Sequence, residues 1–337
     1  MDIVSEARRR RDGDMDTRRR RVVIELAVLV ALAALPFLAN KPFYITVIAE
    51  AMVFAIAAMS LDLLLGYTGL ASFGHAAFFG IGAYTAGLIG VKFTALLPVT
   101  LGAAMGTAAV AALVGGWLAI RSAGIYFIFL TLALAQMVFA IVFKWRSLTG
   151  GDDGLSGVPR PSLWPFESLI DTGDNRVFYL VTLAIFAVAY LVLRRIVSSG
   201  FGTVLVGIRE NAGRMTAIGY NVQAYKIAAF VLSGAFAGLA GGLFAHLFQL
   251  VSPEQAHWQT SALLLIMVVL GGSGSLVGPI VGALIVVLLH NVVSTYTERW
   301  PLIMAGTFIL VVMFARGGLW GMASRFVARR SAGRGGS

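Results

Sequence analysis

Stretches of about twenty mainly apolar residues recur along the chain, and they constrain its fold more than any other feature. A helix needs about 20 such residues to cross the hydrocarbon core of a bilayer. Backbone polar groups in lipid must be hydrogen-bonded within the protein, which favours helices for these stretches. The sequence therefore predicts an all-α integral membrane protein. Ten segments meet the length criterion: 22–39, 43–65, 73–91, 96–120, 124–143, 177–197, 226–251, 258–272, 276–296 and 300–316.

Composition agrees with a lipid environment. Of the 337 residues, 58% are hydrophobic and only 12% are charged, and the mean hydropathy is +0.86. A soluble domain carries about 25% charged residues. The lipid bilayer is therefore an expected partner. Because the chain has no cysteine, disulfides and cysteine metal sites are excluded.

The basic residues lie at the ends of the apolar runs, so the net charge of +10 indicates orientation and no nucleic-acid partner. Ten crossings and arginine clusters at both ends predict that both termini are cytoplasmic. We expect a cytoplasmic Arg-rich tail over residues 1–21 and a transmembrane domain over 22–316. A basic cytoplasmic tail is expected over 317–337. Within the domain, residues 144–176 would form an external loop and 198–225 a cytoplasmic loop.

Two glycine-rich segments interrupt the apolar pattern. Residues 66–74, within "GYTGLASFGHAAFFGIGAY", are named the first break, and residues 271–278, within "LGGSGSLVG", the second break. Paired glycine-interrupted helices in two parts of a chain point to a transport site. The predicted substrate pathway comprises Tyr67, Thr68, Ser72, His75, Tyr84 and Ser273. For His75, the competing interpretation is a hydrogen bond at a helix interface, which we favour over contact with substrate.

Two carboxylates, Glu50 and Asp62, lie in or near apolar runs, where charged groups face a cavity or a partner. We expect Glu50 to face the protein interior. We expect Asp62 to be solvated or paired with an arginine. An ion-coupled carrier would need such a carboxylate, so this function remains an alternative. The four histidines share no metal-ligand spacing, and neither a metal site, a cofactor nor a catalytic cluster is predicted.

The polar segment 206–226 is typical of a short amphipathic helix that lies at the membrane surface and docks into another protein. Its charged and polar residues Arg209, Glu210, Asn211 and Arg214 precede Gly219, which is expected to end the helix. A solvated connector is the alternative for a loop of this kind.

Five motifs in register resemble permeases of branched-chain amino-acid ABC importers, and the LivM-type subunit more than the LivH-type. The resemblance covers residues 60 to 320, and the motifs themselves lie between residues 65 and 283. They are "LGYTGLASFGHAAFFGIGAY", "GIYFIFLTLALAQ" (124–136), "LTGGDDGLSGVPRP" (148–161), "RENAGRMTAIGYN" (209–221) and "MVVLGGSGSLVGPIVGA" (267–283).

This resemblance implies half of a pore in the bacterial inner membrane, with a LivH-type sister permease. Two cytoplasmic ABC ATPase subunits and an external, periplasmic substrate-binding protein would complete the importer. Arg209, Glu210, Asn211 and Arg214 would dock into an ATPase, with Gly219 ending the docking helix. The chain has no phosphate-binding G-x-x-x-x-G-K-[ST], so ATP hydrolysis is expected on the partners and not here.

The expected cargo is a branched-chain or similar amino acid. A permease for urea or short amides shares most of these motifs and is the nearest alternative. An ion-coupled secondary carrier, working without ATPases, is the alternative from a different class.

Overall fold

The computed structural model describes residues 29–37, 41–163 and 172–297, with residues 299, 302–303, 305–306, 308–309, 313 and 317–322. The expected tails 1–21 and 317–337 and the expected segments 22–39 and 300–316 fall largely outside these residues.

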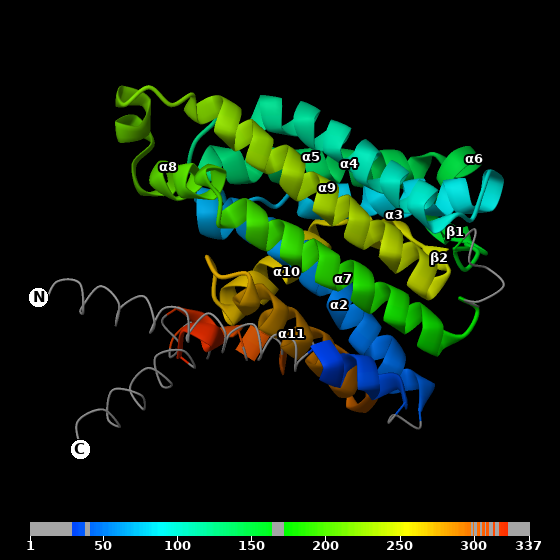
Figure 1. Ribbon diagram of the computed structural model, residues 1–337. Helices are drawn as coiled ribbons and strands as arrows, with labels where there is room; N and C mark the ends of the chain where they lie inside the picture. The colour runs from blue at the N-terminus through cyan, green and yellow to red at the C-terminus, as the bar shows by residue number, and fades with distance from the viewer. Residues whose placement is uncertain are drawn as a thin grey trace, which may run out of the picture.

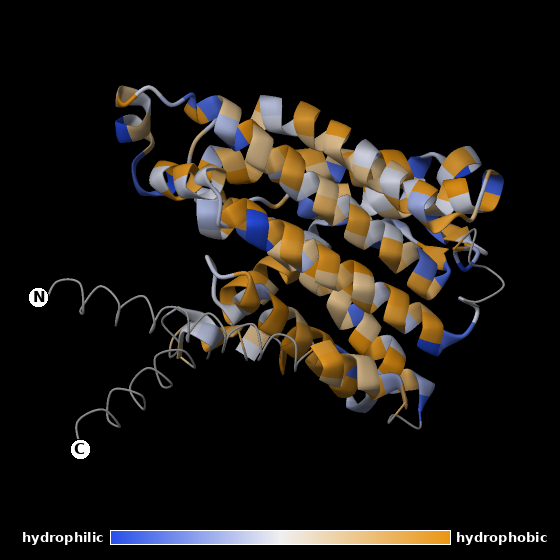
Figure 2. Cartoon of the chain, in the orientation of Figure 1, coloured by the Kyte–Doolittle hydropathy of each residue, from blue (hydrophilic) through white to orange (hydrophobic). Residues whose placement is uncertain are grey.

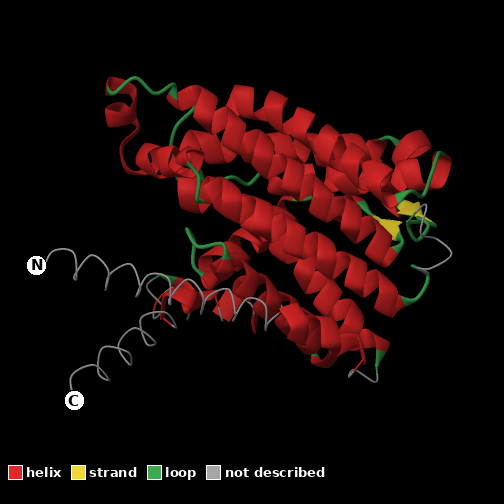
Figure 3. Ribbon diagram, in the orientation of Figure 1, coloured by secondary structure: helices red, strands yellow, loops and turns green. Residues whose placement is uncertain are grey.

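The described chain is built from helices and one very short two-stranded sheet (Figure 3). Strand β1 (Leu155–Ser156) pairs antiparallel with β2 (Leu250–Val251), so that Leu155 lies opposite Val251. The helical elements are α2 (Pro42–Asp62), the π-helical turn η1 (Leu63–Thr68), α3 (His75–Lys92), α4 (Leu97–Ala119), α5 (Ile125–Lys144), α6 (Arg146–Thr149), η2 (Gly151–Asp153), α7 (Asn175–Val197), α8 (Gly200–Ala217), α9 (Val222–Phe248), η3 (Pro253–Ala256), α10 (Trp258–Gly271) and α11 (Val277–Tyr296).

Within the described residues, six helices are long and apolar enough to cross a membrane. They are Pro42–Thr68, Leu97–Ala119, Ile125–Lys144, Asn175–Val197, Val222–Phe248 and Val277–Tyr296. Helix α10, with 14 residues, is apolar but shorter, and α3 is not among the six. The all-α, multi-pass membrane fold is thus confirmed, while the number of ten crossings stays a prediction.

The long helices run side by side, and apolar residues cover most of their length while hydrophilic residues gather toward the two ends (Figures 1 and 2). The span Pro42–Thr68, which contains α2, is the most enclosed of the six, with 89% of its most apolar stretch buried inside the protein. It packs against α7, α9, α10 and α11. A transmembrane helix surrounded in this way can present small and polar side chains to its neighbours without exposing them to lipid.

Small residues bring α9 close to α3 and α4. A side chain at Gly238 would meet Ala108 on α4, and one at Gly82 on α3 would meet the Gly238 backbone. Membrane helices associate by such close backbone approach, because lipid gives them no hydrophobic reason to associate. The glycines of "GAFAGLAGGLFAH" are therefore packing residues.

Helix α8 lies at one end of the bundle, and β1 and β2 lie at the other (Figure 1). The single helix α7 connects these two ends, because it follows the loop that carries β1 and precedes α8. The predicted external loop and the predicted cytoplasmic loop thus occupy opposite ends of the bundle. Which end faces the cytoplasm stays a prediction.

Candidate functional site: the two glycine breaks

The first break begins where α2 changes from α-helical to π-helical geometry in η1. The Thr68 hydroxyl donates to the Leu63 carbonyl at 2.8 Å, and the Leu70 N–H donates to the Leu64 carbonyl at 2.8 Å. Gly69 follows with φ at +78°, in the left-handed region that ends many helices. π-Helical turns inside membrane helices often mark functional positions, and this one precedes the non-helical residues 69–74.

Backbone groups freed by the first break are satisfied by hydroxyl side chains. The Ser72 hydroxyl accepts from the Gly74 N–H at 3.1 Å. Thr131 on α5 accepts from the Phe73 N–H at 3.1 Å, and Ser261 on α10 accepts from the Ala76 N–H at 2.8 Å. Two neighbouring helices thus hold the start of α3 in place, as membrane proteins require where a helix is interrupted.

His75 is fully buried and joins three helices. Its Nε2 lies 2.7 Å from the Ser233 hydroxyl on α9, and that hydroxyl donates to the Ser60 carbonyl on α2. Because a hydroxyl has one proton, the His75 Nε2 must be the donor to Ser233. The Nδ1 atom is buried with no hydrogen-bond partner among the described residues. This geometry matches the interpretation of His75 as an interface residue.

The second break connects α10 to α11 through residues 272–276, with Gly272 at φ +115°. It lies directly against the first break. The Gly274 N–H donates to Asp62 Oδ1 at 2.8 Å, and the Leu276 backbone hydrogen-bonds to the Tyr67 hydroxyl. The two glycine-rich segments, which the sequence only paired by similarity, are in contact in the fold.

The predicted pathway residues do not form one cluster. Tyr67, Thr68, Ser72 and His75 follow one another through the first break, whereas Tyr84 lies about 13 Å further along α3. Tyr84 packs with Val142, Val158 and Val251 near the strand end, and its hydroxyl is buried without a hydrogen-bond partner in the described chain. Ser273 is exposed.

The predicted docking residues lie on α8, which is kinked at Asn211. The Asn211 side chain accepts from the Arg214 N–H at 2.9 Å and so caps the second, short helical piece. Gly219, at φ +96°, follows the last turn, which confirms the expected helix end. Glu210 and Arg214 are exposed.

Arg209 differs from its neighbours because its guanidinium reaches back into the bundle. It donates to the Gly66 carbonyl, and its Cγ and Cβ carbons cover Gly69. Sequence reasoning assigned this residue only to docking. It also missed Thr131, Ser233 and Ser261, although single hydroxyls on otherwise apolar helices are a recognised signal for interhelical hydrogen bonds.

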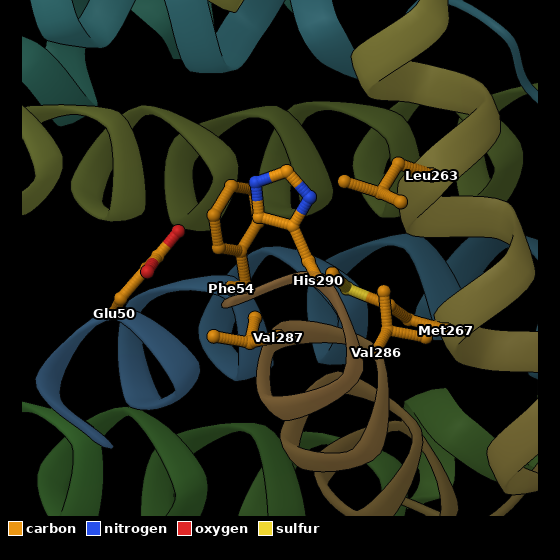
Figure 4. Close-up of a pocket in the computed structure, with 7 residues that line it drawn as sticks. All are labelled: Glu50, Phe54, Leu263, Met267, Val286, Val287 and His290. Atoms are coloured by element: carbon orange, nitrogen blue, oxygen red, sulfur yellow. The ribbon is translucent and has the colours of Figure 1, made fainter. Parts of the chain in front are cut away.

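Both intramembrane carboxylates have hydrogen-bond partners. Asp62 is fully buried against Gly274, and Glu50 Oε2 accepts from the Asn291 side chain on α11 at 3.0 Å. Glu50 borders a cavity of about 100 Å³ (Figure 4), lined by Glu50, Phe54, Leu263, Met267, Val286, Val287 and His290. Small-molecule sites measure roughly 300 Å³ or more, so this space fits only a few waters.

The described residues contain no group of three or more His, Asp or Glu side chains that could hold a metal ion. The polar contacts of the breaks join helices to one another. The serine–histidine contact among them does not make a nucleophile and base, because the Ser233 proton goes to the Ser60 carbonyl and His75 Nε2 donates to Ser233. The arrangement of these contacts is that of a helical membrane transport protein with interrupted helices.

Comparison with known proteins gives the family. Residues 43–316 match the family described as "Branched-chain amino acid transport system / permease component", and the chain belongs to it. It is the permease component of an ABC transporter and is not itself an enzyme.

The relatives carry the LivM name. The chain is 29% identical over 317 residues to the high-affinity branched-chain amino acid transport system permease protein LivM of Escherichia coli (strain K12), covering 87% of this chain and 73% of that protein. LivM of Salmonella typhimurium gives the same values. A probable LivM of Methanocaldococcus jannaschii is 27% identical over 168 residues, 49% of this chain and 47% of that protein. No solved structure matches the chain.

Proposed function

We propose that this permease carries branched-chain or similar amino acids inward across a bacterial inner membrane. It would form half of a pore with a LivH-type sister, and two cytoplasmic ATPases and an external substrate-binding protein would complete the importer. The names of the LivM relatives support the cargo. The described helices place few charged groups in the bundle, which suits a path that binds its cargo weakly.

The proposed topology has ten crossings with both termini in the cytoplasm. The end of the bundle that carries α8 would face the cytoplasm, and the end with β1 and β2 would face outward. The arginines of α7 support this orientation, because Arg194 and Arg195 lie in its last turn, beside α8. The outer end would receive the substrate-binding protein.

The observation that carries the proposed mechanism is the exposed, kinked end of α8. Arg214 lies on a short helical piece that extends from the bundle (Figure 1) and is bounded by the Asn211 cap and Gly219, and Glu210 directly precedes that cap. A rigid, charged helix of this kind fits a groove on another protein. We propose that it docks into an ATPase subunit, whose closure on ATP then changes access to the pore.

Charge reversal tests this docking. The double variant Glu210→Arg/Arg214→Glu should insert normally in the membrane but lose co-purification with the ATPases, or hydrolyse ATP without transport. The paired variant Asp152→Arg/Asp153→Arg at the opposite end of the bundle is the control for altered surface charge and should keep the ATPases. Unchanged transport in the α8 double reversal would remove the docking proposal.

The cargo is tested by reconstituting the four-subunit complex with its binding protein in liposomes. We expect ATP-dependent uptake of leucine, isoleucine or valine. Uptake of urea or acetamide in their place would make this an amide permease. Uptake that continues without ATPases and stops when the proton gradient collapses would make it a secondary carrier.

A further inference from the structure

Three segments far apart in the sequence meet at the α8 end of the bundle. Asp62 is the last residue of α2, Gly274 lies in the second break, and Arg209 lies on α8. Asp62 Oδ1 accepts the Gly274 N–H, and Arg209 donates to the Gly66 carbonyl of the first break. We name this contact of Asp62, Gly66, Arg209 and Gly274 the joint.

The joint holds a buried carboxyl group with incomplete hydrogen bonding. Asp62 is fully buried, and its Oδ2 atom has no hydrogen-bond partner among the described residues. The Arg209 guanidinium attracts this carboxylate. Separating Arg209 from the breaks would remove this attraction, together with the hydrogen bond that Arg209 donates to the Gly66 carbonyl. The electrostatics therefore favour a state in which α8 stays attached to both breaks.

Steric contact makes the joint stiff as well as attractive. A side-chain carbon on Gly66 would overlap Asp62 Oδ1 and the Gly274 backbone, and would lie 2.7 Å from the Gly274 Cα. A Cβ added at Gly69 would lie 2.9 Å from Arg209 Cγ. The Gly66 and Gly274 backbones are in direct contact, so a shift of the first break toward the second must push the second break along.

We propose that the joint transmits a displacement of α8 to both glycine breaks at once, so that α2 and the α10–α11 turn move together when the ATPases act. Asp62 and Arg209 are positioning residues in this role and need not touch the cargo. The proposal rests on the proposed function in one respect, namely that α8 is the segment displaced by the ATPases.

The test uses the complete importer with Asp62→Asn, Arg209→Gln and the double variant. Asparagine keeps an oxygen that can accept the Gly274 N–H but removes the charge. We expect ATP hydrolysis within about twofold of the parent and amino acid transported per ATP reduced about tenfold, within the range of measured coupling energies. The double variant should be no worse than the worse single variant, because both changes remove the same attraction between Asp62 and Arg209.

Arg195→Gln is the matched control, since it removes the same charge from an exposed position at the end of α7, outside the joint. Co-purification with the ATPases is measured first for every variant. If Asp62→Asn does not assemble, Arg209→Gln still tests the joint, because its side chain is mainly exposed.

A second readout follows the segments themselves. The chain has no cysteine, so Ser273→Cys reports on the second break and Thr203→Cys on α8, with cysteine-free partners. With Asp62 and Arg209 unchanged, a non-hydrolysable ATP analogue should change the maleimide labelling rate of both introduced cysteines. In Asp62→Asn, the rate at Thr203→Cys should still respond while that at Ser273→Cys should not.

Parent-level transport per ATP and a parent-level Ser273→Cys response in both single variants would overturn the joint. The joint would also be overturned if the loss of transport per ATP in the double variant equalled the product of the two single-variant losses. If the unmodified complex moves no amino acid, the proposed cargo is wrong, but the labelling response still decides whether α8 and the second break move together.

Discussion

At the scale of single residues, close contact between backbones decides what each position tolerates. Gly66 and Gly106 are both helical glycines, yet a Cβ on Gly66 would meet three atoms at overlapping distance and one on Gly106 would meet none within 4 Å. The same chemical change thus has opposite consequences at the two sites. Glycine content alone, 39 residues in this chain, does not distinguish them.

We expect Gly66→Ala to destabilise the protein by about 1–3 kcal/mol, the usual cost of overpacking a tight contact. Its melting temperature in detergent should fall, and transport should fall with it because the two breaks are pushed apart. Gly106→Ala is the control and should leave both unchanged. Equal melting temperatures for the two variants would show that the breaks are not in contact.

Ser233→Ala should weaken the packing of α2, α3 and α9, since it removes the partner of His75 Nε2 and the donor to the Ser60 carbonyl. Interhelical hydrogen bonds in membranes contribute about 0.6 to 1.7 kcal/mol, so a modest drop in thermal stability is expected. The KM for the amino acid should not change. A raised KM with unchanged stability would instead place His75 in contact with the cargo.

At the scale of elements, α9 depends on small residues on the faces it shares with α3 and α4. Gly238→Val should drive α9 away from Ala104 and Ala108, because a Cβ there would lie 2.6 Å from the Ala104 carbonyl oxygen. We expect a loss of monodisperse protein in size-exclusion chromatography. Gly102→Val on the exposed face of α4 introduces the same side chain where nothing lies within 4 Å and should elute as the parent does.

Element positions were largely predictable because hydrophobic length follows bilayer thickness. The segments expected at 96–120, 124–143 and 276–296 are Leu97–Ala119, Ile125–Lys144 and Val277–Tyr296. Helix α9 begins at Val222, four residues before the expected start, because the Asn221 side chain caps it by accepting from the Ala224 N–H. Hydropathy alone does not report such a cap, although asparagine before a helix is a readable signal.

The partners within the site were not predictable from one sequence. Asp62 and Gly274 are 212 residues apart, and His75 and Ser233 are 158 apart. No local pattern links such positions. The inward turn of Arg209 is similar, because an arginine at a membrane surface is expected to face water. Only the close packing of α8 on η1 brings Gly66 within its reach.

At the scale of the whole molecule, the two ends of the bundle should face different compartments. Asp152 lies at the β1–β2 end and Thr216 near the end of α8, and both are exposed. In intact spheroplasts, we expect an impermeant maleimide to label Asp152→Cys but to label Thr216→Cys only after permeabilisation. Labelling of both cysteines from outside, or of Thr216→Cys alone, would contradict the proposed orientation.

The distance in sequence between Asp62 and Gly274 also bears on how the protein is made. Ribosomes add about 5–20 residues per second, so α2 is synthesised roughly 10 to 40 s before Gly274 exists to receive its carboxylate. During that interval Asp62 has no backbone partner from the second break. A truncated chain that ends before the α10–α11 turn should therefore be unstable. We expect membrane quality-control proteases to degrade it, although most of its spans are already inserted.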